Sequence, residues 1–387
     1  MSKIIFNSGM KIIEYNNGKI IEHNLDFFNR YIENSIRETE KDAWKHSGAG
    51  AQFRGDAIEN LRNSQANEVI RSEITSLQFI DDENINYSLF INDISAIYGK
   101  NLRLKECSES HILHDNNLII KGSSQKNDDI ALTVSNDGIT AHLAIFSKRD
   151  NNFRTVTDGD SYDEHPSYSE SDNDVILFSS KGVGRDYNGN FVEYSPSSIY
   201  TYNIYSQEVN ELYYSEEYSF IKPKQNAKGE IFAIRKPIKD KKKNNLFFNI
   251  LLIPFRLIKA IYYMFESFTR AYTGKGFTEN SANPAKRNEK NPKQIFIDGN
   301  LIYADKEYKL NKKHSGDFAG IIPRNYELVK ILNCGDIEVV YKGVIAYDFD
   351  CDGNFIISNG KYIIKTDGKN TEKLTECKFA TTLSILK

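Results

Sequence analysis

Alternating carboxylates stand out near the C-terminal end of the chain. Asp348, Asp350 and Asp352 precede Gly353 with the D-x-D-x-D-G spacing of a calcium loop. Such oxygen ligands around a glycine turn can wrap a hard cation. A full loop also carries a ligand at its ninth position and a glutamate at its twelfth, where this chain has Ile356 and Asn359. The pattern favours an acidic turn between two strands, and it leaves calcium as the one metal candidate.

A second acidic group consists of Asp158, Asp160, Asp163 and Glu164, followed by His165. It precedes a predicted strand, in the kind of loop that can gather at a binding face. A solvated loop is the favoured interpretation, because nothing in the spacing specifies a ligand.

Two further segments carry weaker signals. His111 and His114 form an H-x-x-H pair without a third metal ligand in view, which is typical of ordinary surface histidines. Residues 47–55 are glycine-rich but lack the spacing of a phosphate-binding loop. Together with Trp44, the residues Phe53 and Arg54 suit a partner contact or close docking on the rest of the chain.

Residues 239–291 differ most from the rest of the sequence. Between 239 and 290 there are eleven Lys and Arg against four Asp and Glu, a net charge of +7 in a chain of net −3. The adjoining residues 246–268 form an apolar run whose few polar side chains share one stripe at helical spacing. This predicts a basic amphipathic helix inserted within one structural repeat.

The inserted helix has two open interpretations. Crossing a bilayer is disfavoured, because Arg256 and Lys259 would lie near its middle and because repeats flank the insertion on both sides. The helix can lie on an anionic membrane surface, or it can pack on the chain itself or on a second subunit. The predicted contact residues are Lys241, Lys242, Lys243, Phe247, Phe248, Leu251, Leu252, Phe255, Arg256, Lys259, Ile261, Tyr262 and Phe265.

The elements that would position these residues are short strands. Over residues 158–215 the order strand, turn, strand, loop, strand, turn, strand predicts one antiparallel four-stranded meander, with residues 182–196 as a long loop. Similar but weaker patterns cover 74–104, 113–156, 220–234 resuming at 294–309, 318–341 and 344–374. Residues 25–37 have helical periodicity, within a helical and loop excursion over 25–65.

The stretch beginning at Pro166 resembles the TolB-type β-propeller repeat, whose usual form is P-x-W-S-P-D-G-x-x-I-x-F followed by an I-Y-x-x-D strand. Pro166, Ser167, Tyr168 and Ser169 match its opening, with Tyr168 in the Trp position, and Ile199-Tyr200 match the later strand. The P-D-G turn is replaced by residues 170–174. The resemblance implies a β-propeller fold and no particular activity.

The whole chain is therefore predicted to be one all-β propeller of about seven four-stranded blades, or six if two weak ones merge. Strands within residues 2–22 are expected to join a strand at 381–386 and close the ring. The 387 residues suffice for this fold. Four cysteines without a CxxC pair, and an N-terminus without a signal-peptide pattern, predict a cytoplasmic location.

These observations favour a non-catalytic scaffold that binds a protein partner and is held at the inner membrane face by residues 241–272. The net charge of −3 gives no reason to expect nucleic-acid binding. No nucleophile elbow, H-E-x-x-H motif or P-loop occurs, so no catalytic residue and no cofactor are predicted. Two alternatives stay open: a hydrolase or lyase using acidic residues at the central face, and a homo-oligomer joined through the inserted helix.

Overall fold

The computed structural model of the protein describes residues 3–43, 71–92, 94–104, 108–115, 118–238, 294–297, 300–315, 318–332 and 335–387. The chain divides into two compact units, one of residues 1–27, 71–238 and 293–387 and the other of residues 28–70 and 239–292. Trp44, Phe53, Arg54 and the predicted helix within 239–291 lie outside the described residues.

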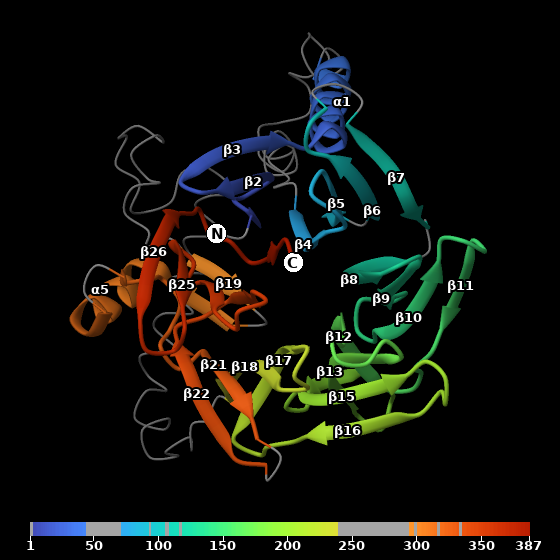
Figure 1. Ribbon diagram of the computed structural model, residues 1–387. Helices are drawn as coiled ribbons and strands as arrows, with labels where there is room; N and C mark the ends of the chain where they lie inside the picture. Colours follow the sequence, from blue (N-terminus) through green and yellow to red (C-terminus); the bar gives the residue numbers. More distant parts are fainter. Residues whose placement is uncertain are drawn as a thin grey trace, which may run out of the picture. The chain divides into compact units, whose positions relative to one another are not determined.

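The first unit is built from antiparallel sheets arranged around a centre, which Figure 1 shows along the axis of the ring. Six sheets of the described residues have four strands in sequence, and we number them as blades 1–6. From the inner to the outer strand, blade 1 is β27 (Leu383–Ile385), β1 (Ile4–Asn7), β2 (Lys11–Asn16) and β3 (Lys19–Asn24). Blade 2 is β4 (Ser72–Phe79), β5 (Asn84–Ile91), β6 (Ile94–Asn101) and β7 (Glu109–His114).

The other four blades repeat this order. Blade 3 is β8 (Ile119–Lys126), β9 (Asp129–Ser135), β10 (His142–Ser147) and β11 (Asn152–Thr155). Blade 4 is β12 (Ser161–Tyr168), β13 (Val175–Arg185), β15 (Ser198–Asn203) and β16 (Val209–Tyr213), with β14 (Phe191–Tyr194) added on β13. Blade 5 is β17 (Tyr218–Gln225), β18 (Ile231–Pro237), β21 (Glu327–Ile331) and β22 (Ile337–Lys342). Blade 6 is β23 (Ala346–Phe349), β24 (Phe355–Ser358), β25 (Tyr362–Thr366) and β26 (Thr371–Glu376).

The second strand of a blade is buried on both faces because a neighbouring blade packs on each. In β9, Ile130 and Leu132 share a hydrophobic cluster with Ile97 of blade 2. Ala131, which points the other way, belongs to a cluster with Tyr168 of blade 4. The sequences of such second strands are therefore continuous apolar runs. The outermost strands, such as β16, are largely exposed to solvent.

Blade 4 confirms the meander predicted over 158–215, but one part of that prediction was wrong. Residues 182–196 are not a long loop, since β13 continues to Arg185 and pairs with β14 in a hairpin. The hairpin turn is stabilised by Asp186, whose Oδ1 accepts the amides of Asn188 and Asn190, both at 2.9 Å.

Blade 5 explains why there are six blades, the lower of the two predicted counts. Residues 294–309 do not resume the blade that β17 and β18 begin. They form a separate hairpin of β19 (Gln294–Ile297) and β20 (Asn300–Tyr303), followed by helix α5 (Ala304–Ser315). The third strand is β21, which pairs with β18, so two predicted repeats are a single blade.

Residues 304–309 were predicted to belong to a blade strand, but they form the start of α5. Its sequence ADKEYKLNKKHS places Asp305 and Glu307 in the first turn and Lys312, Lys313 and His314 in the last. This distribution complements the helix dipole and favours a helix over a strand. The helix predicted over 25–37 is present as α1 (Asp26–Ala43). Neither α1 nor α5, the helices of the described residues, is long and apolar enough to cross a membrane.

The two ends of the described chain meet in blade 1. Strand β27 pairs with β1, so that Ile4 lies opposite Ile385 and Phe6 opposite Leu383. Asn7, which is 4% exposed, accepts the amides of Thr381 and Thr382 on its side-chain oxygen at 2.8 and 2.9 Å. The innermost strand of this blade thus comes from the C-terminal part of the chain and the other three from the N-terminal part. The described residues thus form a six-bladed β-propeller.

Candidate functional site

A cavity of about 540 Å³ lies at the centre of the ring, and all six inner strands line it. Its lining includes four lysines, one histidine and two carboxylates, together with many serine and threonine hydroxyls. The charged residues and the histidine are Lys126, His165, Glu170, Lys222, Lys224, Asp348 and Lys387. Among the described residues that line it, ammonium groups therefore outnumber carboxylates.

Bulges in the inner strands affect the direction of some of these side chains. The pairing register shifts between Glu164 and Ser167 in β12, and between Ile221 and Lys224 in β17. Within these bulges His165 and Lys222 have φ angles of 58° and 54°. Each is followed by a proline, Pro166 or Pro223, although the residue before proline favours extended backbone. Two equivalent non-glycine residues are thus held in a strained conformation at the cavity.

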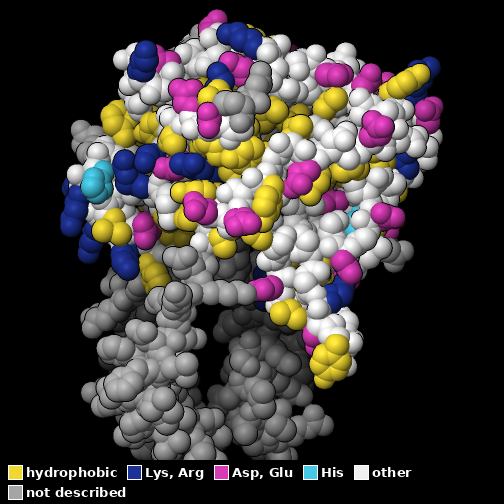
Figure 2. Space-filling model, turned by 90° about the horizontal axis from the view of Figure 1, so that it is seen from below, with side chains coloured by type: hydrophobic (Ala, Val, Ile, Leu, Met, Phe, Trp, Pro, Cys, Tyr) yellow, Lys and Arg dark blue, Asp and Glu magenta, His cyan; other side chains and the backbone are white. Residues whose placement is uncertain are grey.

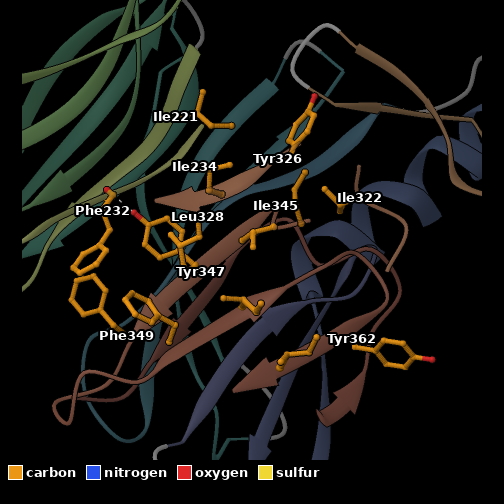
Figure 3. Close-up of a cluster of buried hydrophobic side chains, with 14 of the residues drawn as sticks. Ile221, Phe232, Ile234, Ile322, Tyr326, Leu328, Ile345, Tyr347, Phe349 and Tyr362 are labelled. Carbon is orange, nitrogen blue, oxygen red and sulfur yellow. Dashed lines mark hydrogen bonds between the residues drawn. The ribbon is translucent and has the colours of Figure 1, made fainter. Parts of the chain in front are cut away.

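Lys222 joins three parts of the ring. Its Nζ donates to the carbonyl of Ile345 at 3.0 Å and to that of Thr381 at 2.7 Å. Its own carbonyl accepts the hydroxyl of Tyr347 at 2.8 Å, and the same hydroxyl lies 2.8 Å from the carbonyl of Phe232. Figure 3 shows Tyr347 beside Phe232 in the apolar cluster between blades 5 and 6. The buried phenol therefore satisfies a carbonyl of the bulge, and burial raises its pKa far above the ordinary value.

The two carboxylates of the cavity are engaged by lysines. Asp348 accepts Lys224 Nζ at 2.9 Å and the amide of Ile385 at 3.0 Å, and Lys387 Nζ lies 3.6 Å away. Glu170 is paired with Lys387. Lys126 donates to the carbonyl of Ser169 at 2.6 Å, and burial lowers the pKa of its ammonium group despite the nearby charges of Asp172 and Asp174.

Hydroxyls and amides bridge blades 2 and 3 beside the cavity. Ser123 Oγ lies 2.6 Å from Ser76 Oγ and 2.8 Å from Ser88 Oγ. The side-chain amide of Gln78 donates to the carbonyl of Gln125 at 2.8 Å and accepts the backbone amide of Gln125 at 2.7 Å. This side of the cavity is stabilised by neutral polar groups.

The three aspartates of the predicted calcium pattern have different surroundings. Asp348 faces the central cavity, as described above. Asp350 Oδ1 accepts the amides of Asp352 and Asn354 at 3.0 and 2.8 Å, and so caps the turn between β23 and β24. Among the described residues, no group of three or more His, Cys, Asp or Glu side chains could hold a metal ion.

The acidic group at 158–164 lies half before β12 and half along it, and three of its carboxylates are bonded to the blade. Asp163 is 3% exposed and accepts the hydroxyls of Thr157 and Ser180 at 2.5 and 2.6 Å. Burial raises its pKa, and these hydrogen bonds only partly oppose the rise. Glu164 and Asp160 form ion pairs with Lys181 and Arg185 at 3.1 and 2.7 Å.

The two histidines of the H-x-x-H pair pack against each other on β7. Their ring centres are 5.7 Å apart, and His111 also packs on Tyr98 at 5.2 Å. His114 Nδ1 lies 3.0 Å from the carbonyl of Ser95. Burial, and then the proximity of His114, lowers the pKa of His111. The pair contributes to the packing of blade 2.

The β13–β14 hairpin has a fixed base and an exposed tip. At the base, the hydroxyl of Tyr194 donates to the carbonyl of Ile139 of blade 3 at 2.8 Å. Lys181 Nζ lies 4.4 and 4.8 Å from the ring centres of Tyr162 and Tyr194. Beyond the base, Tyr187, Phe191 and Val192 are 97%, 39% and 58% exposed. Figure 2 shows a projection at the lower right whose tip carries hydrophobic side chains, on the side where β13 lies in Figure 1.

Sequence reasoning missed the lysines of the central cavity. The signal that could have found Lys222 and Lys224 is the Lys-Pro-Lys tripeptide at the place where blade 4 has His-Pro-Ser. Both tripeptides occupy inner strands, but only the arrangement of the blades shows that these strands line one cavity.

Comparison with known proteins gives partial likenesses. No protein-family model and no curated protein matches the sequence. Among solved structures, TolB from Acinetobacter baumannii is similar at 13% identity and a TM-score of 0.46, over 82% of this chain and 57% of that one. An oligogalacturonate lyase in complex with manganese is similar at 11% identity and a TM-score of 0.30, over 41% and 45%. A puromycin hydrolase is similar at 7% identity and a TM-score of 0.33, over 73% and 32%. The chain thus spans less than two thirds of each of these structures, and the propeller assignment rests on the strand pairing described above.

Proposed function

We propose that this protein is a non-catalytic β-propeller scaffold that binds a protein partner through the β13–β14 hairpin. The observation that carries the proposal is the exposure of Tyr187, Phe191 and Val192 on a hairpin whose base is fixed to blade 3. Aromatic side chains on a preorganised support supply much of the energy of protein interfaces. No other described blade has a fifth strand, so the hairpin distinguishes blade 4 from its neighbours.

The central cavity supports binding rather than acid–base chemistry. An alternative hydrolase or lyase would use carboxylates that converge from several blades. The cavity has two, Asp348 and Glu170, and each is engaged by a lysine. This arrangement favours the scaffold over the enzyme.

Cross-linking capture with two matched variants tests the hairpin. Tyr187→Ser removes the aromatic ring at the exposed tip, while Tyr205→Ser removes one that is 90% exposed in the turn after β15. Proteins captured by both the wild type and Tyr205→Ser are expected to be lost, or reduced at least about tenfold, with Tyr187→Ser. Equal capture by all three proteins would contradict the role of the hairpin.

We also propose that residues 241–272 hold the scaffold at the inner, cytoplasmic face of a membrane. The support is the sequence: a net charge of +7 over 239–290, next to an apolar run. Basic residues beside an apolar face favour anionic lipid surfaces. The competing occupants of that face are the rest of the chain itself and a second copy of the chain.

Co-sedimentation with vesicles separates these alternatives. Full-length protein is expected to pellet with phosphatidylserine-containing vesicles and much less with neutral ones, and a deletion of 241–272 is expected to stay in solution. Equal pelleting of the two proteins would refute the membrane proposal. Analytical ultracentrifugation of the same pair would reveal an oligomer that depends on the segment.

A further inference from the structure

Helix α5 is fixed to the ring along one side. Asn311 is 4% exposed, and its side-chain amide donates to the carbonyls of Gly320 and Ile322 at 2.9 and 2.8 Å. Ile322 belongs to the apolar cluster between blades 5 and 6. The ring centre of Tyr308 lies 4.1 Å from the Nζ of Lys361, which directly precedes β25 of blade 6. These contacts hold α5 in one orientation on the two blades.

The opposite side of α5 carries lysines. Lys306, Lys309 and Lys313 follow one another at three- and four-residue spacing. At about 100° per residue they fall within about 60° of one another and point away from Asn311. All three are exposed to solvent, and Leu310 beside them is 44% exposed. We call Lys306, Lys309 and Lys313 the lysine face of α5.

The lysine face carries positive charge that nearby carboxylates do not pair. Lys330 and Lys342 of blade 5 form ion pairs with Glu230 and Glu327. Within the described part of the chain, the lysine face has no ion pair. The whole helix has four lysines against two carboxylates, and both carboxylates lie in its first turn. Figure 2 shows Lys and Arg side chains gathered at its left edge, the side on which α5 lies in Figure 1.

The lysine face lies in the connection between the second and third strands of blade 5, β18 and β21. Residues 239–292 belong to the same connection. In an antiparallel blade, this connection is at the opposite end of the strands from the turns that join the first strand to the second and the third to the fourth. The lysine face and the proposed membrane segment are thus attached to the same end of blade 5.

We propose that the lysine face of α5 is a second contact with an anionic lipid surface, in addition to residues 241–272. This inference rests on the proposed membrane association of that segment. Exposed ammonium groups are attracted to anionic headgroups, and Leu310 can enter the boundary between headgroups and acyl chains. Two contacts on one rigid scaffold bind more strongly than either alone, because the second binding event is intramolecular. The apolar side chain among the lysines favours a lipid surface over a nucleic acid.

Vesicle partitioning of the full-length protein, with two charge-matched variants, tests the lysine face. The vesicles contain phosphatidylserine and phosphatidylcholine. The face variant carries Lys306→Gln, Lys309→Gln and Lys313→Gln. The control variant carries Lys19→Gln, Lys228→Gln and Lys369→Gln, which remove three exposed lysines in or beside turns at the other end of the blades.

The face variant is expected to partition at least about tenfold more weakly than the wild type, and the control variant about as strongly as the wild type. Equal partitioning of the two variants would overturn the inference. Replacing the same three lysines by arginine retains the charge and is expected to retain the partitioning. A loss with arginine as large as that with glutamine would contradict an electrostatic contact.

The deletion of 241–272 separates this inference from the proposed function. If the deletion abolishes partitioning and the face variant binds like the wild type, the lysine face has no role and the membrane proposal stands. If the face variant loses partitioning and the deletion does not, the lysine face is supported and the role of 241–272 is refuted. Binding of polyuridylate that the face variant abolishes, with unchanged vesicle partitioning, would assign the face to nucleic acid and overturn the inference.

Discussion

At the scale of single residues, buried carboxylates of this ring hold backbone amides in place. Glu109 has a side chain that is 3% exposed and lies at the start of β7. Its two oxygens accept the amides of Asp26 and Phe27 at 3.0 and 2.8 Å, where α1 begins. Lys100 Nζ lies 3.3 Å away and balances the charge. Glu109 thus caps a helix that is distant from it in sequence.

Glu109→Ala is expected to lower the free energy of unfolding by about 3–5 kcal/mol, because Lys100 stays buried without its counter-ion and two amides lose their acceptor. Glu109→Gln retains an acceptor oxygen and should lose less. Urea unfolding followed by tyrosine fluorescence measures both. A Glu109→Ala protein as stable as the wild type would show that the cap contributes little.

At the scale of elements, side-chain oxygens cap the turns between inner and second strands. Asp81, Ser169, Asn226 and Asp350 each accept backbone amides two or more residues ahead, in blades 2, 4, 5 and 6. Side chains that bond nearby amides in this way specify tight turns. The D-x-D-x-D-G pattern therefore contains a turn cap shared with other blades, which accounts for the central aspartate without a metal.

Asp350→Ala is expected to destabilise the protein by about 1–3 kcal/mol, equally with calcium and with EDTA. Burial opposes ionisation of Asp350, but hydrogen bonds from Asn354 and the charge of Lys365 outweigh it and hold its pKa below the ordinary value. Its stabilising effect is therefore present above the unfolded pKa near 3.8, and is lost as the pH falls through the lower folded pKa.

Thermal unfolding of the wild type and Asp350→Ala between pH 2 and pH 7 measures both effects. The difference between the two proteins should shrink at the acid end of this range. A calcium-dependent rise in the melting temperature of the wild type, absent from Asp350→Ala, would show that this turn binds calcium and would contradict the role of Asp350 as a turn cap alone.

At the scale of the whole molecule, the ring depends on the joining of its two ends in blade 1. Asn7 bonds Thr381 and Thr382 through both functions of its side-chain amide, and β27 pairs with β1 beside it. Closing a ring removes the exposed sheet edge that would otherwise face solvent. Lys222 adds a contact from blade 5 to the carbonyl of Thr381 in the same segment.

Asn7→Ala is expected to lower stability by about 1–3 kcal/mol, since two part-buried amides lose their acceptor. Asn7→Asp retains the acceptor oxygen and should be less harmful, and Asn16→Ala, at the exposed end of β2, should have little effect. Denaturant midpoints with hydrogen exchange at β1 and β27 measure the change. Faster exchange spread evenly over all blades, rather than concentrated at the closure, would argue against a local role for Asn7.

The candidate site was only partly predictable from the sequence. Tyr168, Ile199 and their neighbours indicated the blade at 158–215, because strand patterns of buried and exposed residues are local. The lysines of the cavity gave no such pattern. Lys126, Lys222 and Lys224 come from blades 3 and 5, and only the ring brings them to one cavity.

What the sequence by itself determined is the class of fold, since repeated four-stranded patterns with polar turns leave few arrangements other than a propeller. Only the tertiary structure decided the number of blades, because β18 pairs with β21 across an intervening stretch of about 90 residues that carries a helix and a hairpin of its own. Lengthening a loop costs little additional entropy, so a long insertion between two paired strands is tolerated. The local sequence pattern therefore does not show which strand β18 pairs with. The tertiary structure likewise decided that residues 182–196 contain a hairpin, since β14 is held by pairing with β13 and by the contact of Tyr194 with blade 3.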